Sequence, residues 1–375
     1  MLGPSAARSV LERLADVAAA RSLSTPPPSV AQLSGLDAWL VRHDLAPLAR
    51  TAFLAWDAEL AARLTPAAFG AAAANLAHFE TLAALERRFE KARVGMVLLK
   101  GASAATTWYA DPSFRPMTDL DLWVPEAEMA RAVGLLAEAG FRQDPGLAHR
   151  PEALQRLSGG ELVFRPDGGR HGLVELHFSP FPGWWIRRTA DPDLAALWAR
   201  SEAMGRDRHA RRLAAEDALL QTSFHVVVNQ FGQAPLRGLM DLAVIARARA
   251  LDWDAVADRA RRWRLAHATW LALDTANRLI GLPGVEPALA RLRPSRGRLR
   301  ILRSLLTPGS LLAGRDLTRP ARRHPFMLAL VDRPRDAGRL IGRAVWPERW
   351  WVAARHGRSA GRLAHVRHLL RRGEV

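Results

Sequence analysis

The stretch VLLKGASAATTWYADPSFRPMTDLDLWV, residues 97–124, decides which fold this chain is predicted to adopt. Its apolar start at Val97 is typical of a buried strand. The small residues after Lys100 favour a tight turn into a helix, whose first N–H groups and positive dipole end can receive a phosphate. The end of the stretch alternates acidic and apolar residues, as a strand with one polar face does.

The acidic strand carries two carboxylates that point the same way. Asp119 and Asp121 share one face of the predicted strand, and Leu120 and Leu122 share the other. Carboxylates at positions i and i+2 lie about 6–7 Å apart along a strand, close enough to share Mg²⁺. A phosphate-binding turn beside such a pair indicates metal-assisted phosphoryl or nucleotidyl transfer.

The order of these features resembles the signature of the nucleotidyltransferase superfamily, the DNA polymerase β-like fold. There a Gly-Ser or Gly-Gly turn precedes Asp-x-Asp, and a third carboxylate follows on a later strand. The likeness covers about residues 91–180. The Lys-Gly-x-Ser form, with Arg ahead of the acids, is similar to toxin-type nucleotidyltransferases. It is more similar to a bacterial family that recurs in lasso-peptide biosynthesis clusters. The chain departs from the commonest pattern at Ala102-Ser103, where Gly-Ser or Gly-Gly is usual.

Glu175 matches the third acid of the superfamily. It lies in the segment GLVELHF, residues 172–178, where strand alternation places Glu175 and His177 on one face. The Gly168-Gly169 pair upstream predicts a hairpin turn from a preceding strand at 161–164. The Glu-x-His ending also matches the closer family.

The resemblance implies an α/β (α+β) fold, with a small mixed-sheet nucleotidyltransferase core and helical additions on both sides. It implies transfer of NMP from an NTP to an acceptor, with release of pyrophosphate and with two Mg²⁺ ions. The residues implied as catalytic and metal-binding are Asp119, Asp121 and Glu175. Those implied to hold the β- and γ-phosphates are Lys100, Gly101 and Ser103, while Arg115 would neutralise charge or brace the acidic loop.

The acceptor stays open at this stage between a peptide, a protein, a small molecule and a tRNA end. The closer family favours peptide natural-product biosynthesis. Two other functions are weighed against it: a non-catalytic scaffold that binds nucleotide or a partner, and a toxin-like enzyme that modifies tRNA.

Four regions are expected along the chain: a helical region at 1–90, the catalytic core at 91–182, a helical domain at 183–318 and a basic tail at 319–375. The predicted helices include 70–93, 126–139, 216–231 and 236–250. The tail contains 14 Arg against 4 acids, with Trp residues between them. It suits a membrane surface, a partner or an acidic substrate, or a solvated arm.

Three polar residues in the helical domain are also candidates, namely His225, Arg237 and Asp241. The closer family has a similar His and a similar Arg/Asp pair. Their alternative interpretations are a core histidine and an i,i+4 ion pair on a helix surface.

Composition limits the remaining possibilities. The net charge of +17 would normally indicate nucleic acid or an anionic surface, but 52 of the 54 basic residues are Arg, a bias that also fits a GC-rich coding background. Lys100 is one of only two lysines, and a compact ammonium suits phosphate. The absence of cysteine excludes disulfides and thiolate metal sites. The sequence has no apolar run of about 18 residues, so no transmembrane helix is predicted. A cytoplasmic location is expected.

Overall fold

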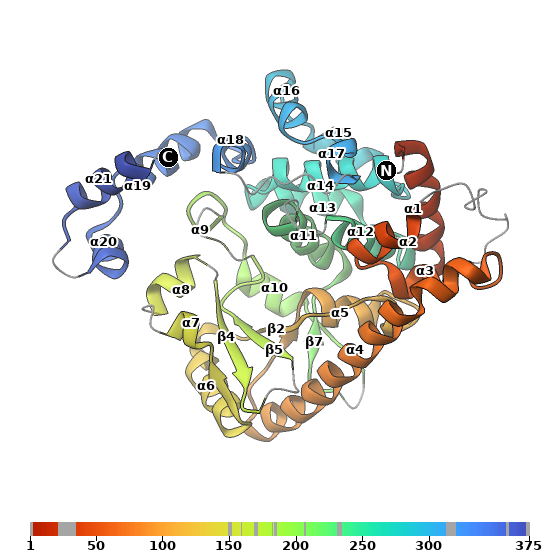
Figure 1. Ribbon diagram of the computed structural model, residues 1–375. Helices are drawn as coiled ribbons and strands as arrows, with labels where there is room; N and C mark the ends of the chain where they lie inside the picture. Colours follow the sequence, from red (N-terminus) through yellow and green to blue (C-terminus); the bar gives the residue numbers. More distant parts are fainter. Residues whose placement is uncertain are drawn as a thin grey trace.

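The computed structural model has a mixed seven-stranded sheet enclosed by helices, which confirms the predicted α+β fold (Figure 1). The strand order is β3-β4-β5-β2-β1-β7-β6. The strands are β1 (Val97–Leu98), β2 (Asp119–Trp123), β3 (Phe141–Gln143), β4 (Glu161–Pro166), β5 (Leu173–His177), β6 (Glu202–Ala203) and β7 (Arg211–Arg212). The structure describes residues 3–21, 35–148, 152–158, 160–168, 172–181, 183, 186–205, 208–230, 235–312, 320–357 and 360–372.

The register of the central strands sets up a polar face. β2 and β5 run parallel, and Asp121 is paired with Glu175. β4 lies antiparallel on the other side of β5, and Glu161 is paired with His177. Since cross-strand partners point to the same face of a sheet, these four side chains share one face. The predicted pairing of the 161–164 and 173–178 segments is therefore confirmed.

The opposite face of the sheet is apolar and packs on α4 (Ala58–Ala92) and α6 (Met129–Glu138). Leu120 and Leu176 are fully buried there, as strand alternation requires. The long helix α4 begins earlier than the predicted residue 70, because Asp57 caps it by accepting a hydrogen bond from the Leu60 N–H at 2.8 Å. The helix predicted at 126–139 is α6 preceded by a 3-10 turn, and Gly140, with φ of +81°, follows its end.

Helices precede, interrupt and follow the sheet. Up to β5 they are α1 (Pro4–Ala18), α2 (Leu36–Arg42), α3 (Ala46–Phe53), α5 (Lys100–Thr107), α7 (Pro145–Ala148) and α8 (Glu152–Ser158), with 3-10 turns η2 (Pro112–Phe114) and η3 (Glu126–Glu128). After β5 they are α9 (Ile186–Thr189), α10 (Leu194–Arg200), α11 (Ala215–His225), the π-helical η4 (Val226–Gln230), α12 (Pro235–Ala248), α13 (Trp253–Arg262), α14 (Ala266–Leu279), α15 (Glu286–Leu292), α16 (Arg296–Leu305) and α17 (Pro308–Leu312).

A second, larger core lies among the helices and faces the polar side of the sheet. α11, α12 and α14 pack together, and α1 packs against α12 and α14 although it lies far away in sequence. Figure 1 shows the sheet between α4 and this helical body. The helix predicted at 216–231 is α11 extended by η4, and Phe231 lies outside the described residues.

The C-terminal region consists of α18 (Pro320–Ala329), α19 (Pro334–Val345), α20 (Arg349–His356) and α21 (Arg362–Arg372). α19 contacts α9, and Arg188 forms an ion pair with Glu348 at 3.0 Å. Trp346 and Trp350 remain exposed. Within the described part of the chain, none of the helices combines the length and apolar character that a bilayer crossing requires.

Candidate active site

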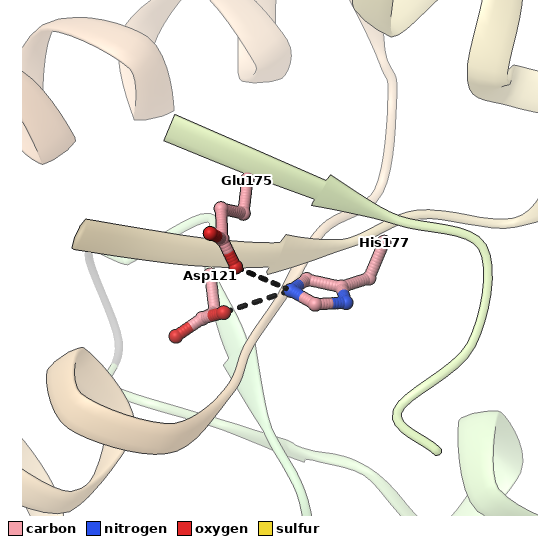
Figure 2. A group of neighbouring side chains, drawn as sticks. All are labelled: Asp121, Glu175 and His177. Atoms are coloured by element: carbon pink, nitrogen blue, oxygen red, sulfur yellow. Dashed lines mark hydrogen bonds and ion pairs between the residues drawn. The ribbon is translucent and has the colours of Figure 1, made fainter. Parts of the chain in front are cut away.

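Asp121, Glu175 and His177 converge on the polar face of the sheet (Figure 2). Each offers one ligand atom, and these three atoms lie within 4.8 Å of one another. His177 Nε2 lies 2.7 Å from Asp121 Oδ1 and 3.6 Å from Glu175 Oε2. No other group of this kind occurs among the residues that the structure describes. The parallel pairing of β2 with β5 produces this arrangement, since it brings together residues 54 positions apart in the sequence.

Lys100 enters the same cluster from the first residue of α5. Its Nζ lies 2.5 Å from Asp121 Oδ1 and 3.6 Å from Glu175 Oε2. The side chain is only 11% exposed. Burial disfavours its charge, but the carboxylates of Asp121, Glu175 and Glu161 outweigh that effect and raise the pKa of the Lys100 ammonium above its usual range. Lys100 is therefore a buried cation held by the predicted metal ligands.

The two acids of the Asp-x-Asp pair have opposite electrostatic surroundings. Burial would raise the pKa of Asp121, but the charge of Lys100 and hydrogen bonds from His177 and Lys100 prevail, so the pKa lies well below its usual range. For Asp119, burial and the charges of Asp121 and Glu175 together raise the pKa to about 6. Asp119 is thus held near two other carboxylates with less compensation, and an added cation would relieve the repulsion.

His177 links the cluster to a further acid that the sequence did not single out. Burial and Lys100 act against a charged imidazole, but the hydrogen bonds with Asp121 and Glu175 raise its pKa to about 9. Glu161 Oε2 lies 3.4 Å from His177 Nδ1, although this nitrogen forms no hydrogen bond. Burial raises the pKa of Glu161 to about 7 against the opposing charge of His177. The protonated imidazole is a donor that orients Asp121.

Arg115 lies in a buried network with the helical body. Its Nε and Nη2 donate to the two carboxylate oxygens of Asp241 on α12 at 2.7 and 2.8 Å. The only tyrosine, Tyr109, donates its O–H to Asp241 at 2.7 Å. The Arg115 and Asp241 side chains are each 5% exposed. Of the two roles considered for Arg115, bracing the loop before Asp119 matches these contacts.

The turn after β1 differs in detail from the expected glycine turn. Lys100 itself has a φ of +46°, while Gly101 and Ser103 are buried within α5. A Cβ on Gly101 would approach Met117 Cγ to 3.2 Å, so the glycine permits close packing against the acidic loop. The left-handed conformation therefore falls on the lysine, whose side chain the carboxylates hold.

The remaining candidates lie on the facing helices. Arg237 donates to Asp44 Oδ2 at 3.1 Å, and its buried Nε has no hydrogen-bond partner. The alternative considered for Arg237 and Asp241 was an i,i+4 ion pair with each other. Instead, Asp241 is paired with Arg115 and Arg237 with Asp44. Burial and the charge of Lys100 lower the pKa of His225 well below its usual range. The charges of Lys100 and Arg237 both act on Asp119, so the two cations lie near the acidic cluster formed by Asp119, Asp121 and Glu175.

Glu161 and Tyr109 are the site residues that the sequence interpretation missed. Strand alternation carried the signal for Glu161, because it places Leu162 and Phe164 on the apolar face and Glu161 on the opposite face, where it is paired with His177. Tyr109 had no comparable signal, since its partner Asp241 lies 132 positions away.

Comparison with known proteins adds one finding. The model of a family described as uncharacterised nucleotidyltransferase matches residues 31–281 of the 375-residue chain, a span that includes the whole sheet and every residue of the acidic cluster. No curated protein matches the chain.

Proposed function

The chain belongs to this uncharacterised nucleotidyltransferase family, and from that premise we propose that it transfers NMP from an NTP to an acceptor with the help of Mg²⁺. The observation that carries the proposal is the convergence of Asp121, Glu175 and His177 from two paired strands. Carboxylate oxygens are the ligands that Mg²⁺ prefers, so Asp119, Asp121 and Glu175 fit the ion. His177, as a protonated donor, fits an orienting role.

The metal ion and Glu175 have different parts in the proposed reaction. Mg²⁺, when bound, would neutralise charge on the triphosphate and orient its α-phosphorus. Glu175, the more accessible of the paired acids at 18% exposure, would accept the proton of the acceptor hydroxyl or phosphate. The new bond forms between that acceptor oxygen and the α-phosphorus. The bond from the α-phosphorus to the bridging oxygen breaks, and its electron pair leaves with pyrophosphate.

The cations around the cluster would hold the phosphates. Lys100 stands at the start of α5, and Gly101 follows it in the first turn, where backbone N–H groups lack helical partners. The Ser103 N–H donates to the Leu99 carbonyl, so Ser103 would offer its hydroxyl. Arg237 lies on the facing helix α12, and its buried Nε forms no hydrogen bond. The proposed acceptor classes remain a peptide, a protein, a small molecule and a tRNA end, with peptide natural-product biosynthesis as the first to test.

Thermal unfolding with each NTP, with and without Mg²⁺, tests the binding step. Ligand at 100 times its Kd adds about 2.7 kcal/mol of stability, so one NTP should raise the Tm, and EDTA should abolish most of the gain. Equal stabilisation with and without Mg²⁺ would assign the binding to the Arg-rich surface and contradict the proposal.

Labelled NTP and Mg²⁺ added to the protein with cell extract, followed by mass spectrometry of the labelled product, would identify the acceptor. NTP binding without any labelled product from extract of the native cells would favour the non-catalytic scaffold. Label on tRNA would favour the toxin-like enzyme.

A further inference from the structure

Lys100 occupies the position at which the proposed function requires a divalent cation. Its Nζ contacts the same Asp121 Oδ1 that faces His177, and it reaches Glu175 on the neighbouring strand. A divalent ion bound to that oxygen would sit about 2.0–2.1 Å from it if the ion were Mg²⁺. The ammonium is 2.5 Å from the same atom. Because the ammonium reaches both Asp121 and Glu175, a divalent ion held by these two carboxylates would have to take its place.

The backbone conformation of Lys100 is unfavourable for a residue other than glycine. Five non-glycine residues of the described chain have positive φ. Four of them follow the end of a helix, where a left-handed residue commonly terminates the helix. Lys100, with φ of +46°, instead stands at a helix start. The ion pairs with Asp121 and Glu175 compensate for the unfavourable conformation.

The chemistry of lysine allows the ammonium to leave. Lysine is a compact point charge on a flexible four-carbon stem, whereas an arginine would hold a carboxylate through a rigid, two-bonded fork. The chain has 52 arginines, yet this position carries one of its two lysines. The first turn of α5 lies beside Lys100, so a triphosphate bound there would offer the ammonium new anionic partners.

Resting on the function proposed above, we propose that the Lys100 ammonium holds the place of the divalent cation until a metal–triphosphate complex arrives. The site then binds free metal weakly, because the metal must displace Lys100 from Asp121 and Glu175. With the triphosphate present, Lys100 moves from the carboxylates to phosphate oxygens, and the metal takes the vacated place. The true ligand of the site is therefore the metal–nucleotide complex rather than either component alone.

The test measures metal affinity directly, without turnover. Mn²⁺ binding is followed by calorimetry, and by the paramagnetic resonance signal of the free ion, in wild type, Lys100→Met and Lys91→Met. Lys91 is the other lysine and is exposed near the end of α4, so its variant is a matched control. Lys100→Met should bind Mn²⁺ alone at least tenfold more tightly than wild type, and Lys91→Met should match wild type. Equal Mn²⁺ affinity in Lys100→Met and wild type would overturn the inference.

A second arm adds α,β-imido analogues of the four NTPs, which cannot release pyrophosphate. One analogue should raise the Mn²⁺ affinity of wild type at least tenfold and that of Lys100→Met by a smaller factor. An equal rise in both proteins would also overturn the displacement, while the proposed function would stand. If neither protein takes up Mn²⁺ with any analogue, the proposed function fails together with the inference. Lys100→Gln, which is neutral but can still donate to Asp121, repeats both arms if Lys100→Met does not fold.

Discussion

Removal of the Asp241 carboxylate should destabilise the protein more than removal of a surface charge. Asp241 accepts two hydrogen bonds from Arg115 and one from Tyr109, at 2.7, 2.8 and 2.7 Å. The ion pair is 5% exposed on each side. Asp241→Leu would leave a buried guanidinium without its partner, which costs about 3–5 kcal/mol of unfolding free energy. Urea unfolding followed by tryptophan fluorescence measures the loss.

Replacement of the whole network separates the cost of a stranded charge from the loss of packing. In Arg115→Met/Asp241→Leu/Tyr109→Phe no buried charge is left unpaired, although the part-buried Pro116 carbonyl loses the hydrogen bond from Arg115 Nη1. Exchanges of a buried ion pair for apolar residues are often neutral or stabilising. The triple variant should therefore recover most of the stability that Asp241→Leu alone loses. A loss below about 1 kcal/mol in the single variant, or no recovery in the triple, would refute the assignment of a buried, desolvated ion pair.

The network also connects stability to the site. Arg115 leads directly into the acidic strand, and Asp241 belongs to the helical body. If the ion pair positions Asp119, the triple variant should fold and bind NTP but turn over slowly. Full turnover in a stable triple variant would limit the network to a structural role.

The remaining predictions concern the charges of the cluster. At pH 7.5 Asp119→Asn should leave the Tm unchanged or raise it, because it removes a carboxylate that its neighbours repel. Asp121→Asn should lower the Tm, because Lys100 and His177 lose their partner. Each variant should cut turnover by about 10²–10³-fold, and equal Tm changes in the two variants would contradict this prediction. In EDTA the unfolding free energy should fall between about pH 6.5 and pH 9, because the folded pKa of His177 (about 9) exceeds that of an unfolded imidazole, so the folded state binds more protons in this window. Below about pH 6.5 the raised pKa values of Asp119 and Glu161 (about 6 and 7) act in the same direction, whereas the lowered pKa values of histidines such as His43 and His225 act in the opposite direction. Urea titrations from about pH 6.5 to pH 9 would show the fall, and Glu161→Gln should make the slope of unfolding free energy against pH more positive between about pH 4.5 and pH 7; an unchanged slope would exclude Glu161 as a contributor.

Local patterns in the sequence were sufficient to predict the centre of the sheet. The period-two alternation around Asp121 and Glu175 indicated both strands and the shared face, and the glycine pair indicated that the second of these strands forms a hairpin with the segment before it. These signals work because a strand has only two faces, and only one of them packs against α4 and α6.

The contacts between distant segments had no such signal. Arg115 and Asp241 are 126 positions apart, and Arg115 is one of 52 arginines, so nothing local distinguishes its partner. The ion pair of Lys100 with Asp121 depends on the direction in which a residue with left-handed backbone conformation points its side chain at the start of α5. No residue pattern predicts that conformation. Long-range packing and side-chain direction had to come from the structure.

The packing of α1 has a consequence for how the chain folds during its synthesis. Val10, Leu11 and Leu14 are fully buried, and α1 contacts the neighbouring α3 as well as the distant α12, α14 and α17, of which α12 and α14 end at residues 248 and 279. At about 5–20 residues per second, the ribosome needs roughly ten to fifty seconds between α1 and the completion of α14. Throughout that interval the apolar side of α1 lacks its final partners. A nascent chain interrupted before residue 279 should therefore be a substrate for chaperones and proteases.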